Sequence, residues 1–272
     1  MELNITVVDA FTDRLFKGNP AAVLLLDEWL DEALMQAIAA ENNLSETAFV
    51  KRLADDHFHI RWFSPVDEVA FCGHATLASA FVIFSEQPQL SCIRVYAAAV
   101  GELIVSRQDN GYLQMSFPQR LPVTLDAVPA ALLAMLSVAP TAVMRSEQAY
   151  FAIYDDEAAI RSLNYDRQQL AALAPYDVVV TAPGTDYDFV CRYFWPDTGE
   201  DPVTGSIYAG LAPYWAAVLN KTELKAYQAS HRGGVLHCRV AEDRVFVSGQ
   251  AVRYLRGVIE VQGSEDAVLG KR

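Results

Sequence analysis

The chain has 272 residues, of which 52% are hydrophobic and 20% charged, an ordinary globular composition with enough apolar material for one large or two small cores. Its 34 acidic and 21 basic residues give a net charge of −13 without any run of Lys or Arg, which argues against nucleic acid or an anionic membrane surface as partner. No apolar stretch approaches the ~20 residues that span a bilayer, the N-terminus lacks signal-peptide features, and the four cysteines form no C-x-x-C pair, so we expect a cytoplasmic protein.

The first predicted elements are a strand, a helix and a second strand within residues 19–50, "NPAAVLLLDEWLDEALMQAIAAENNLSETAFV". In the second strand, Glu46 shares one face with Ala48 and Val50, because side chains alternate along a strand. A carboxylate that points inward from this face needs a partner, and a partly buried glutamate can move protons near neutral pH. The alternative is a glutamate at a strand start whose side chain leans into water.

The stretch "FCGHATLASAFVIF", residues 71–84, predicts a helix that begins near Cys72, Gly73 and His74. The run that follows is rich in small and apolar residues and has no polar face, which is typical of a buried helix. Three strands are predicted next, within residues 92–117. From residue types alone, the cysteine and histidine are compatible with metal binding, nucleophilic catalysis, anion binding or packing.

The second half of the chain repeats this order of elements. After a cluster of three prolines at residues 117–129, the predicted elements are a strand, helix and strand (149–182), a small-residue helix (205–219) and three strands (224–249). Gly73 aligns with Gly205 and Tyr96 with Tyr227, at an offset of about 131–132 residues.

The repeat predicts two α/β halves of ordinary domain size. We place the first half at residues 1–118 and the second at residues 119–257, and we consider a return of residues from about 258 to 272 to the first half.

Both small-residue helices begin with glycine and a polar residue, Gly73-His74 and Gly205-Ser206. The N–H groups of a first turn have no partner inside the helix and form the positive end of its dipole, and glycine lets a ligand approach the backbone closely. If the two halves face each other, these helix starts form a cradle for a carboxylate or phosphate. The alternative is that Ser206 only caps its helix and that His74 has only a structural role.

A further acidic residue, Asp201, lies just before the second of these helices in "GEDPVTGS". The proline after it disfavours a helical conformation and predicts an extended or turn conformation. Cys72, His74 and Asp201 have neither the number nor the spacing of a closed metal site, so we expect no metal here.

Five motifs, in order from about residue 5 to residue 260, resemble the phenazine-biosynthesis PhzF-like family, which belongs to the diaminopimelate-epimerase fold. They are "DAFTDRLFKGNPAAV", "NNLSETAFV", "IRWFSPVDEVAFCGHATLAS", "GEDPVTGSIYAGLAPYW" and "HRGGVLHCRV" with "VFVSGQAV". The resemblance implies an α/β (α+β) architecture of two pseudo-symmetric halves. Each half is then a curved, mostly antiparallel sheet wrapped around a central small-residue helix, with the active site in the cleft.

The resemblance also implies roles for individual residues. In the family, the glutamate of the S-E-T motif, Glu46 here, shuttles a proton in a cofactor-free isomerisation. The family histidine and aspartate at the positions of His74 and Asp201 assist and orient the substrate. The positions that hold the carboxylate of a small substrate are Gly73, Gly205 and Ser206. The implied protein is an isomerase without a cofactor, in a family that often forms homodimers.

Cys72 acquires a specific interpretation from the same resemblance. Diaminopimelate epimerases use two thiols that face each other, one from each half, and Cys72 occupies the first position whereas Thr204 occupies the second. A threonine hydroxyl holds its proton too tightly to serve as the opposing acid or base near neutral pH. We therefore interpret Cys72 as a small packing residue or a minor modulator.

Two other functions stay open from the sequence. One is an epimerase or racemase that uses unlike bases, Glu46 with His74 or Cys72. The other is a non-catalytic protein that binds small carboxylates. Inversion at one carbon with solvent exchange favours the epimerase, and binding without turnover favours the binding protein. The analogy of fold does not identify the substrate.

Overall fold

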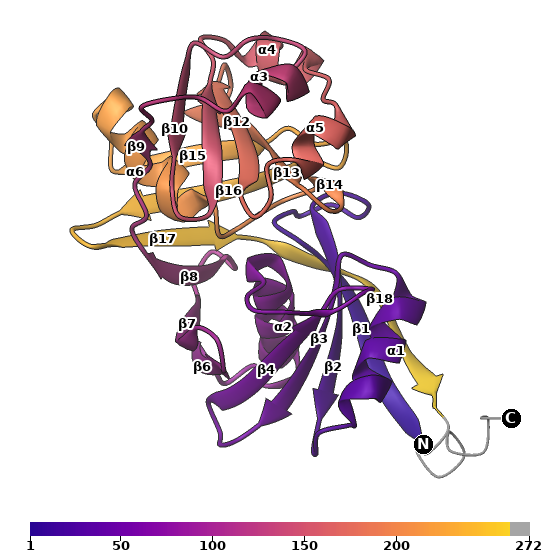
Figure 1. The fold of residues 1–272 in the computed structure, drawn as a ribbon. Helices are drawn as coiled ribbons and strands as arrows, with labels where there is room; N and C mark the ends of the chain where they lie inside the picture. Colours follow the sequence, from indigo (N-terminus) through magenta and orange to yellow (C-terminus); the bar gives the residue numbers. More distant parts are fainter. Residues whose placement is uncertain (262–272) are drawn as a thin grey trace, which may run out of the picture.

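The computed structural model describes residues 1–261, whose strands all belong to one continuous hydrogen-bonded sheet that is folded into two lobes (Figure 1). The first half contains β1 (Glu2–Ala10), β2 (Asn19–Leu26), α1 (Glu32–Asn42), β3 (Glu46–Arg52), β4 (His57–Phe63), β5 (Glu68–Val69), α2 (Gly73–Glu86), β6 (Cys92–Ala97), β7 (Gly101–Arg107) and β8 (Leu113–Pro118). The second half contains β9 (Val123–Thr124), α3 (Ala130–Met135), β10 (Ala142–Arg145), β11 (Ala149–Ile153), α4 (Glu157–Ser162), α5 (Arg167–Ala171), β12 (Asp177–Pro183), β13 (Phe189–Trp195), β14 (Gly199–Asp201), α6 (Tyr208–Leu219), β15 (Glu223–Gln228), β16 (Gly234–Val240) and β17 (Arg244–Gly249), and β18 (Ala251–Glu260) follows.

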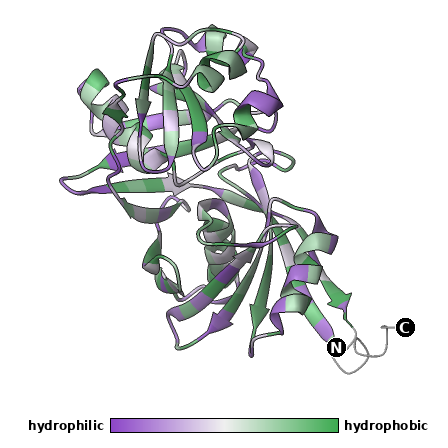
Figure 2. Ribbon diagram, in the orientation of Figure 1, coloured by the Kyte–Doolittle hydropathy of each residue, from purple (hydrophilic) through white to green (hydrophobic). Residues whose placement is uncertain are grey.

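In the first half, the strands curve around α2 (Figure 1). Every residue of this helix from Gly73 to Ala80 is buried, as its small and apolar composition predicts. The other helix of this half, α1, lies against β3 and β4 on the outside and carries both hydrophilic and hydrophobic residues (Figure 2). It buries one stripe, formed by Met35, Ile38 and Ala39.

In the second half, α6 takes the place that α2 has in the first. It packs against β15, β16 and β17 and is buried from Tyr208 to Pro213. Three short helices, α3, α4 and α5, cover the opposite face of the sheet, where Leu132, Ile160 and Leu170 form a second cluster. The prediction that each small-residue helix is the core of its own half is confirmed.

The strand register repeats between the halves at an offset of about 131 residues. β3 pairs antiparallel with β4 as β12 does with β13, and β4 pairs parallel with β6 as β13 does with β15. Tyr96 lies opposite His59. Tyr227, which the sequence aligned with Tyr96, lies opposite Val190 at the equivalent place. The internal repeat is therefore confirmed at the level of single residues.

Two strand pairings join the halves. β8 pairs antiparallel with β17, and β18 leaves the second half to pair with β1, from Ala251 opposite Ala10 to Glu260 opposite Glu2. We keep the division after residue 118, where β8 ends. The return to the first half begins at Ala251, earlier than the residue of about 258 that the sequence suggested, and residues 262–272 lie outside the described residues.

One hydrophobic cluster extends through both halves and contains residues of α2, such as Leu77, together with residues of α6, such as Leu211 and Trp215. The halves thus share a core, and each has a further cluster on the face away from its central helix. Among residues 1–261, no helix has the length and apolar character needed to cross a membrane.

Candidate active site

The starts of the two central helices meet between the halves. Gly73 is the first residue of α2, and a methyl group on its Cα would lie 3.5 Å from the Cα of Gly205 and 3.6 Å from the amide nitrogen of Ser206. The second helix begins later than the sequence predicted, because Gly205 and Ser206 lie in a turn in which the Tyr208 N–H donates to the Gly205 carbonyl at 3.3 Å. The start of α2 and the turn before α6 thus converge. Both present backbone N–H groups without an intrahelical partner, which is an arrangement suited to an anion.

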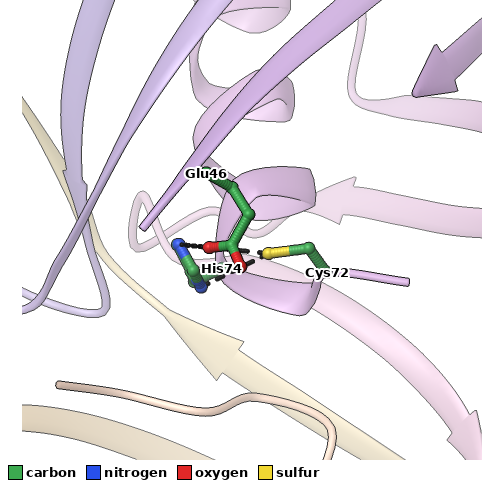
Figure 3. Close-up of side chains that lie close together, drawn as sticks. All are labelled: Glu46, Cys72 and His74. Carbon is green, nitrogen blue, oxygen red and sulfur yellow. Dashed lines mark hydrogen bonds and ion pairs between the residues drawn. The ribbon is translucent and has the colours of Figure 1, made fainter. Parts of the chain in front are cut away.

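Glu46 is the first residue of β3 and is 7% exposed. Its Oε2 atom lies 3.0 Å from Nε2 of His74, the second residue of α2 (Figure 3). The two atoms are not aligned as a hydrogen bond, and Oε2 has no hydrogen-bond partner within residues 1–261. A buried carboxylate oxygen in this state is available to a ligand.

His74 is 5% exposed. Its other ring nitrogen, Nδ1, faces the side-chain amide of Asn19. Asn19 Nδ2 lies 3.1 Å from His74 Nδ1 and donates to Asp201 Oδ1 at 2.9 Å. Because an amide NH₂ group only donates, Nδ1 accepts, and we assign the proton of the neutral ring to Nε2, beside Glu46. Burial lowers the pKa of His74, but the charge of Glu46 and the contact with it, together with the charge of Asp201, outweigh burial and raise this pKa.

Asp201 ends β14 and enters the site from the second half. Its carboxylate accepts from Asn19 and from the hydroxyl of Thr204. Burial raises the pKa of Asp201 to about 6, whereas the charge of His74 acts in the opposite direction. Gln228 braces this segment, because its Nε2 donates to the Asp201 carbonyl at 2.9 Å and its Oε1 accepts from the Thr204 N–H at 2.9 Å.

Cys72 precedes α2 and touches the same group of side chains. Its Sγ atom lies 3.4 Å from His74 Nδ1, and the residue is 6% exposed. Burial, and then the charge of Glu46, raise the pKa of the thiol well above its usual value. The thiol therefore keeps its proton at neutral pH, and its contact with His74 suits a modulator better than a base.

Three atoms that can bind a metal, one each from Glu46, Cys72 and His74, lie within 4.8 Å of one another. The sequence argument about metals left out Glu46, which supplies the third of these atoms. Burial, and then the charge of Glu46, raise the pKa of the Cys72 thiol, so a metal ion would have to displace the thiol proton. That no metal binds here stays a prediction.

Three amide side chains in the site were not singled out in the sequence: Asn19, Gln148 and Gln228. Asn19 and Gln228 are fully buried, and Gln148 donates to the Ser206 hydroxyl at 2.9 Å. The only sequence signal for any of them is the position of Asn19 inside the motif "DAFTDRLFKGNPAAV".

A cavity of about 560 Å³ opens elsewhere, lined by residues of both halves that include Tyr112, Arg161 and Arg232. None of the predicted site residues lines this cavity. We place the candidate active site at the helix starts, because Glu46, His74 and Asp201 converge there with the backbone at Gly73 and Gly205.

By sequence and by structure, the chain is similar to members of one protein family. The family model described as phenazine biosynthesis-like protein (PhzC-PhzF) matches residues 8–257. An uncharacterized isomerase of Pseudomonas aeruginosa is 46% identical over 263 residues, which cover 96% of this chain and 100% of that protein. The crystal structure of a PhzF-family phenazine biosynthesis protein from Enterococcus faecalis superposes with a TM-score of 0.90 at 40% identity, covering 96% of this chain and 100% of that one.

A more distant structure shows the likeness of fold alone. It is a hydroxyproline epimerase from Agrobacterium vitis with bound trans-4-hydroxy-L-proline, which superposes with a TM-score of 0.60 at 11% identity, covering 97% of this chain and 94% of that one.

The fold and the relatives define the class of this protein as an isomerase with the mixed α/β, sheet-dominated architecture of the epimerases. Within that class, the chain belongs to the phenazine biosynthesis-like (PhzC-PhzF) family. The fold class and the family that the sequence motifs predicted are both confirmed.

Proposed function

We propose that this isomerase moves a proton within a small carboxylate-bearing substrate by general acid/base catalysis, without a cofactor and with Glu46 as the proton shuttle. The observation that carries the proposal is the Glu46 Oε2 atom. It is buried, has no hydrogen-bond partner within residues 1–261, and lies 3.0 Å from His74 where the two helix starts converge. This oxygen can take a proton from a substrate carbon while the helix starts hold the substrate carboxylate.

In the proposed reaction, Glu46 removes an acidic C–H proton and returns it to another carbon of the same molecule. Negative charge then develops on the substrate and spreads to its carboxylate. The dipole of α2 at Gly73-His74 and the backbone N–H groups of the Gly205-Ser206 turn stabilise this charge, because both are already in place and need no reorganisation.

His74 and Asp201 assist in this scheme. His74 Nε2 lies 3.0 Å from Glu46 and can donate a hydrogen bond to charge that develops on the substrate. Asp201 acts through Asn19, whose Nδ2 contacts both Asp201 and His74 Nδ1 and so holds the ring with Nε2 toward Glu46.

The epimerase with unlike bases is the second candidate, because the Cys72 Sγ atom lies 3.4 Å from the ring of His74. Its difficulty is the raised pKa of the buried thiol, which leaves little thiolate at neutral pH. The route through Glu46 needs no thiolate, and we therefore prefer it.

A small carboxylate is the proposed substrate class for two reasons. The converging helix starts suit a carboxylate, and the hydroxyproline epimerase of the same fold holds trans-4-hydroxy-L-proline. Assembly as a homodimer and a cytoplasmic location remain predictions from the family resemblance and the sequence. The proposed steps use only side chains and backbone groups of this chain.

The test compares Glu46→Gln with Cys72→Ala. Glu46→Gln keeps the shape of the side chain and removes the base, so turnover should fall by ~10²–10⁴-fold while carboxylate binding largely survives. Cys72→Ala should cost mainly stability, about 1 kcal/mol, as small core truncations do. The readout is C–H exchange of small carboxylates in deuterated solvent, followed by NMR.

Three results would contradict the proposal. Exchange that is lost in Cys72→Ala and intact in Glu46→Gln means thiol chemistry. Inversion at a single carbon in the wild-type protein means an epimerase. Saturable binding without exchange across the carboxylates means a non-catalytic binding protein.

A further inference from the structure

Asp177 occupies in the second half the position that Glu46 occupies in the first. Each is the first residue of its strand, β12 or β3. Each lies opposite an alanine of the parallel strand before it, Ala149 for Asp177 and Ala21 for Glu46. The offset of about 131 residues between the two carboxylates is that of the whole repeat. The repeat thus places one carboxylate at the start of the corresponding strand in each half.

Asp177 is connected to Ser206 by two side chains. The Tyr193 hydroxyl donates to Asp177 Oδ2. Gln148 Nε2 donates both to the Tyr193 oxygen, at 2.7 Å, and to the Ser206 oxygen, at 2.9 Å. Tyr193 is fully buried, whereas Asp177, Gln148 and Ser206 are partly exposed.

In both halves, the polar residue after the glycine, His74 or Ser206, is therefore connected to a carboxylate. In the first half, Glu46 contacts His74 directly. In the second half, Asp177 reaches Ser206 through the tyrosine and the glutamine. In both halves, a carboxylate at a strand start is linked by contacts to a polar side chain near a helix start.

The donor and acceptor of each hydrogen bond between Asp177 and Ser206 can be assigned. An ionised Asp177 only accepts, so Tyr193 donates to it, and the tyrosine oxygen is left to accept from Gln148. The second amide hydrogen of Gln148 goes to the Ser206 oxygen. The Ser206 hydroxyl hydrogen must then point outside the chain, and no acceptor for it is found within residues 1–261. It is a free donor beside Gly205, where the substrate carboxylate is expected.

We propose that Asp177 is a positioning residue that, through Tyr193 and Gln148, orients the Ser206 hydroxyl as a hydrogen-bond donor to the substrate carboxylate. The proposal rests on the proposed function only for the place of the carboxylate, and it does not require Glu46 to move a proton.

Protonation of Asp177 should reverse the direction of the hydrogen bonds that link it to Ser206. Burial raises the pKa of Asp177 to about 6, the hydrogen bond from Tyr193 acts in the opposite direction, and the charge of Asp197 adds to the rise. The other titratable group beside the chain is Asp201 on β14, opposite Tyr193. Above this pKa, Ser206 donates. Below it, a protonated Asp177 can donate to Tyr193, the amide of Gln148 can turn over, and Ser206 then donates to that amide instead of to the ligand.

The experiment measures binding of acetate, benzoate and L-proline by NMR titration, with the tightest of the three as the probe. Tyr193→Phe breaks the chain and should weaken the probe about tenfold, the effect of one charge-assisted hydrogen bond. In a Ser206→Ala background the same substitution should have no further effect. Between pH 5 and 7.5, affinity should rise with pH more steeply in the wild-type protein than in Asp177→Asn, which does not titrate.

Tyr154→Phe is the matched control. Tyr154 is also buried in the second half, and its hydroxyl donates to the Val138 carbonyl at 2.7 Å, away from the site. This variant should lose stability and keep the affinity of the wild-type protein. The proposal is overturned if Tyr193→Phe binds normally, if it weakens binding equally in the Ser206→Ala background, if Asp177→Asn keeps the full pH dependence, or if none of the three carboxylates binds saturably. Binding that follows this pattern without C–H exchange would overturn only the proposed function.

Discussion

At the scale of single residues, Asn19 ties the two halves together inside the site. Its side-chain amide has two hydrogens and three acceptors in reach: His74 Nδ1 at 3.1 Å, Asp201 Oδ1 at 2.9 Å and the Val203 carbonyl at 2.9 Å. Its own oxygen accepts from the Ser45 hydroxyl, which fixes the orientation of the amide. Two of the acceptors belong to the second half, so the ring of His74 is oriented by contact between the halves.

The pKa of Asp201 predicts a dependence of stability on pH. The folded state raises this pKa from 3.8 to about 6, so between these values the folded protein binds more protons than the unfolded chain. The free energy of unfolding therefore falls as pH rises from about 4 to about 6, by on the order of 1–3 kcal/mol from this group. Asp201→Asn keeps the shape and does not titrate, so relative to wild type it should be more stable at pH 8 than at pH 4.5.

Urea denaturation of both proteins at the two pH values measures this difference. Asp177, whose pKa is also raised to about 6, is present in both proteins and cancels from the comparison. A stability difference that is the same at both pH values would contradict the prediction.

We predict that the cluster of Glu46, Cys72 and His74 does not hold a metal tightly, because a metal ion would have to displace the proton of the buried Cys72 thiol. Protein purified without added metal should contain far less than one transition-metal ion per chain by elemental analysis. Dialysis against a chelator should leave the melting temperature and the C–H exchange unchanged. A stoichiometric metal whose removal abolishes exchange would show that Glu46 is a ligand and not a free base.

The charged residues of the candidate site could be predicted from the sequence, whereas the amide side chains of Gln148 and Gln228 could not. Glu46, His74 and Asp201 lie in recognisable motifs next to glycine, proline and strand patterns that predict their surroundings. Gln148 and Gln228 have no such pattern, because their role depends on which backbone segments the tertiary fold brings beside them. A buried amide is recognised only when its partners are known, and here those partners are distant in sequence.

At the scale of secondary structure, α6 shows how closely the chain packs around a small-residue helix. A Cβ atom on Gly210, in the first turn of α6, would lie 2.8 Å from the Arg120 carbonyl oxygen and 2.8 Å from the ring of Phe151. The Arg120 N–H donates to the Ala209 carbonyl at 2.9 Å, so the segment between the halves crosses the helix at this point. Glycine is needed here for space, although it weakens a helix in general.

Gly210→Ala should therefore destabilise the protein by about 1–3 kcal/mol, as overpacking does, despite the better helix propensity of alanine. The matched control is Gly257→Ala on β18, where the nearest atom to a new Cβ is a Leu255 methyl carbon at 3.7 Å. The control should change the free energy of unfolding by less than about 0.5 kcal/mol. Denaturant titration compares the two variants, and equal effects would contradict the packing argument.

The helices and strands that the sequence predicted occur in the predicted order, whereas two of their boundaries differ. The single helix expected within residues 149–182 is two helices, α4 and α5, because the Asp166 side chain accepts from the Gln168 and Gln169 N–H groups and starts a new helix. The start of α6 lies after Gly205 and Ser206 because these residues form a turn against Gly73. That turn depends on the facing half, which a local pattern does not show.

At the scale of the whole molecule, the shared hydrophobic cluster and the two inter-half strand pairings make the halves one structural unit. Neither half is complete by itself, since β1 depends on β18, which follows the second half in sequence. The repeat that is visible in the sequence therefore overstates the independence of the halves.

We accordingly predict a single cooperative unfolding transition. Trp29 and Trp62 report on the first half and Trp195 and Trp215 on the second. In variants that keep only one of these pairs, the fluorescence midpoint in urea should coincide with the circular dichroism midpoint of the same variant. Two separate transitions would show that the halves fold independently. A fragment of residues 1–118 should lack a stable fold, because the β18 edge of β1 is then uncovered.

The pairing of β1 with β18 also brings the Met1 amino group to within 2.6 Å of the Val261 carbonyl. On the ribosome, β1 emerges before the whole second half and β18 emerges after it, so the first half cannot complete this pairing until the second half has been synthesised. Throughout that interval, one edge of β1 remains open to pairing with other strands. The order of synthesis thus opposes the order of assembly, and the newly made chain depends on protection of that edge until β18 is released.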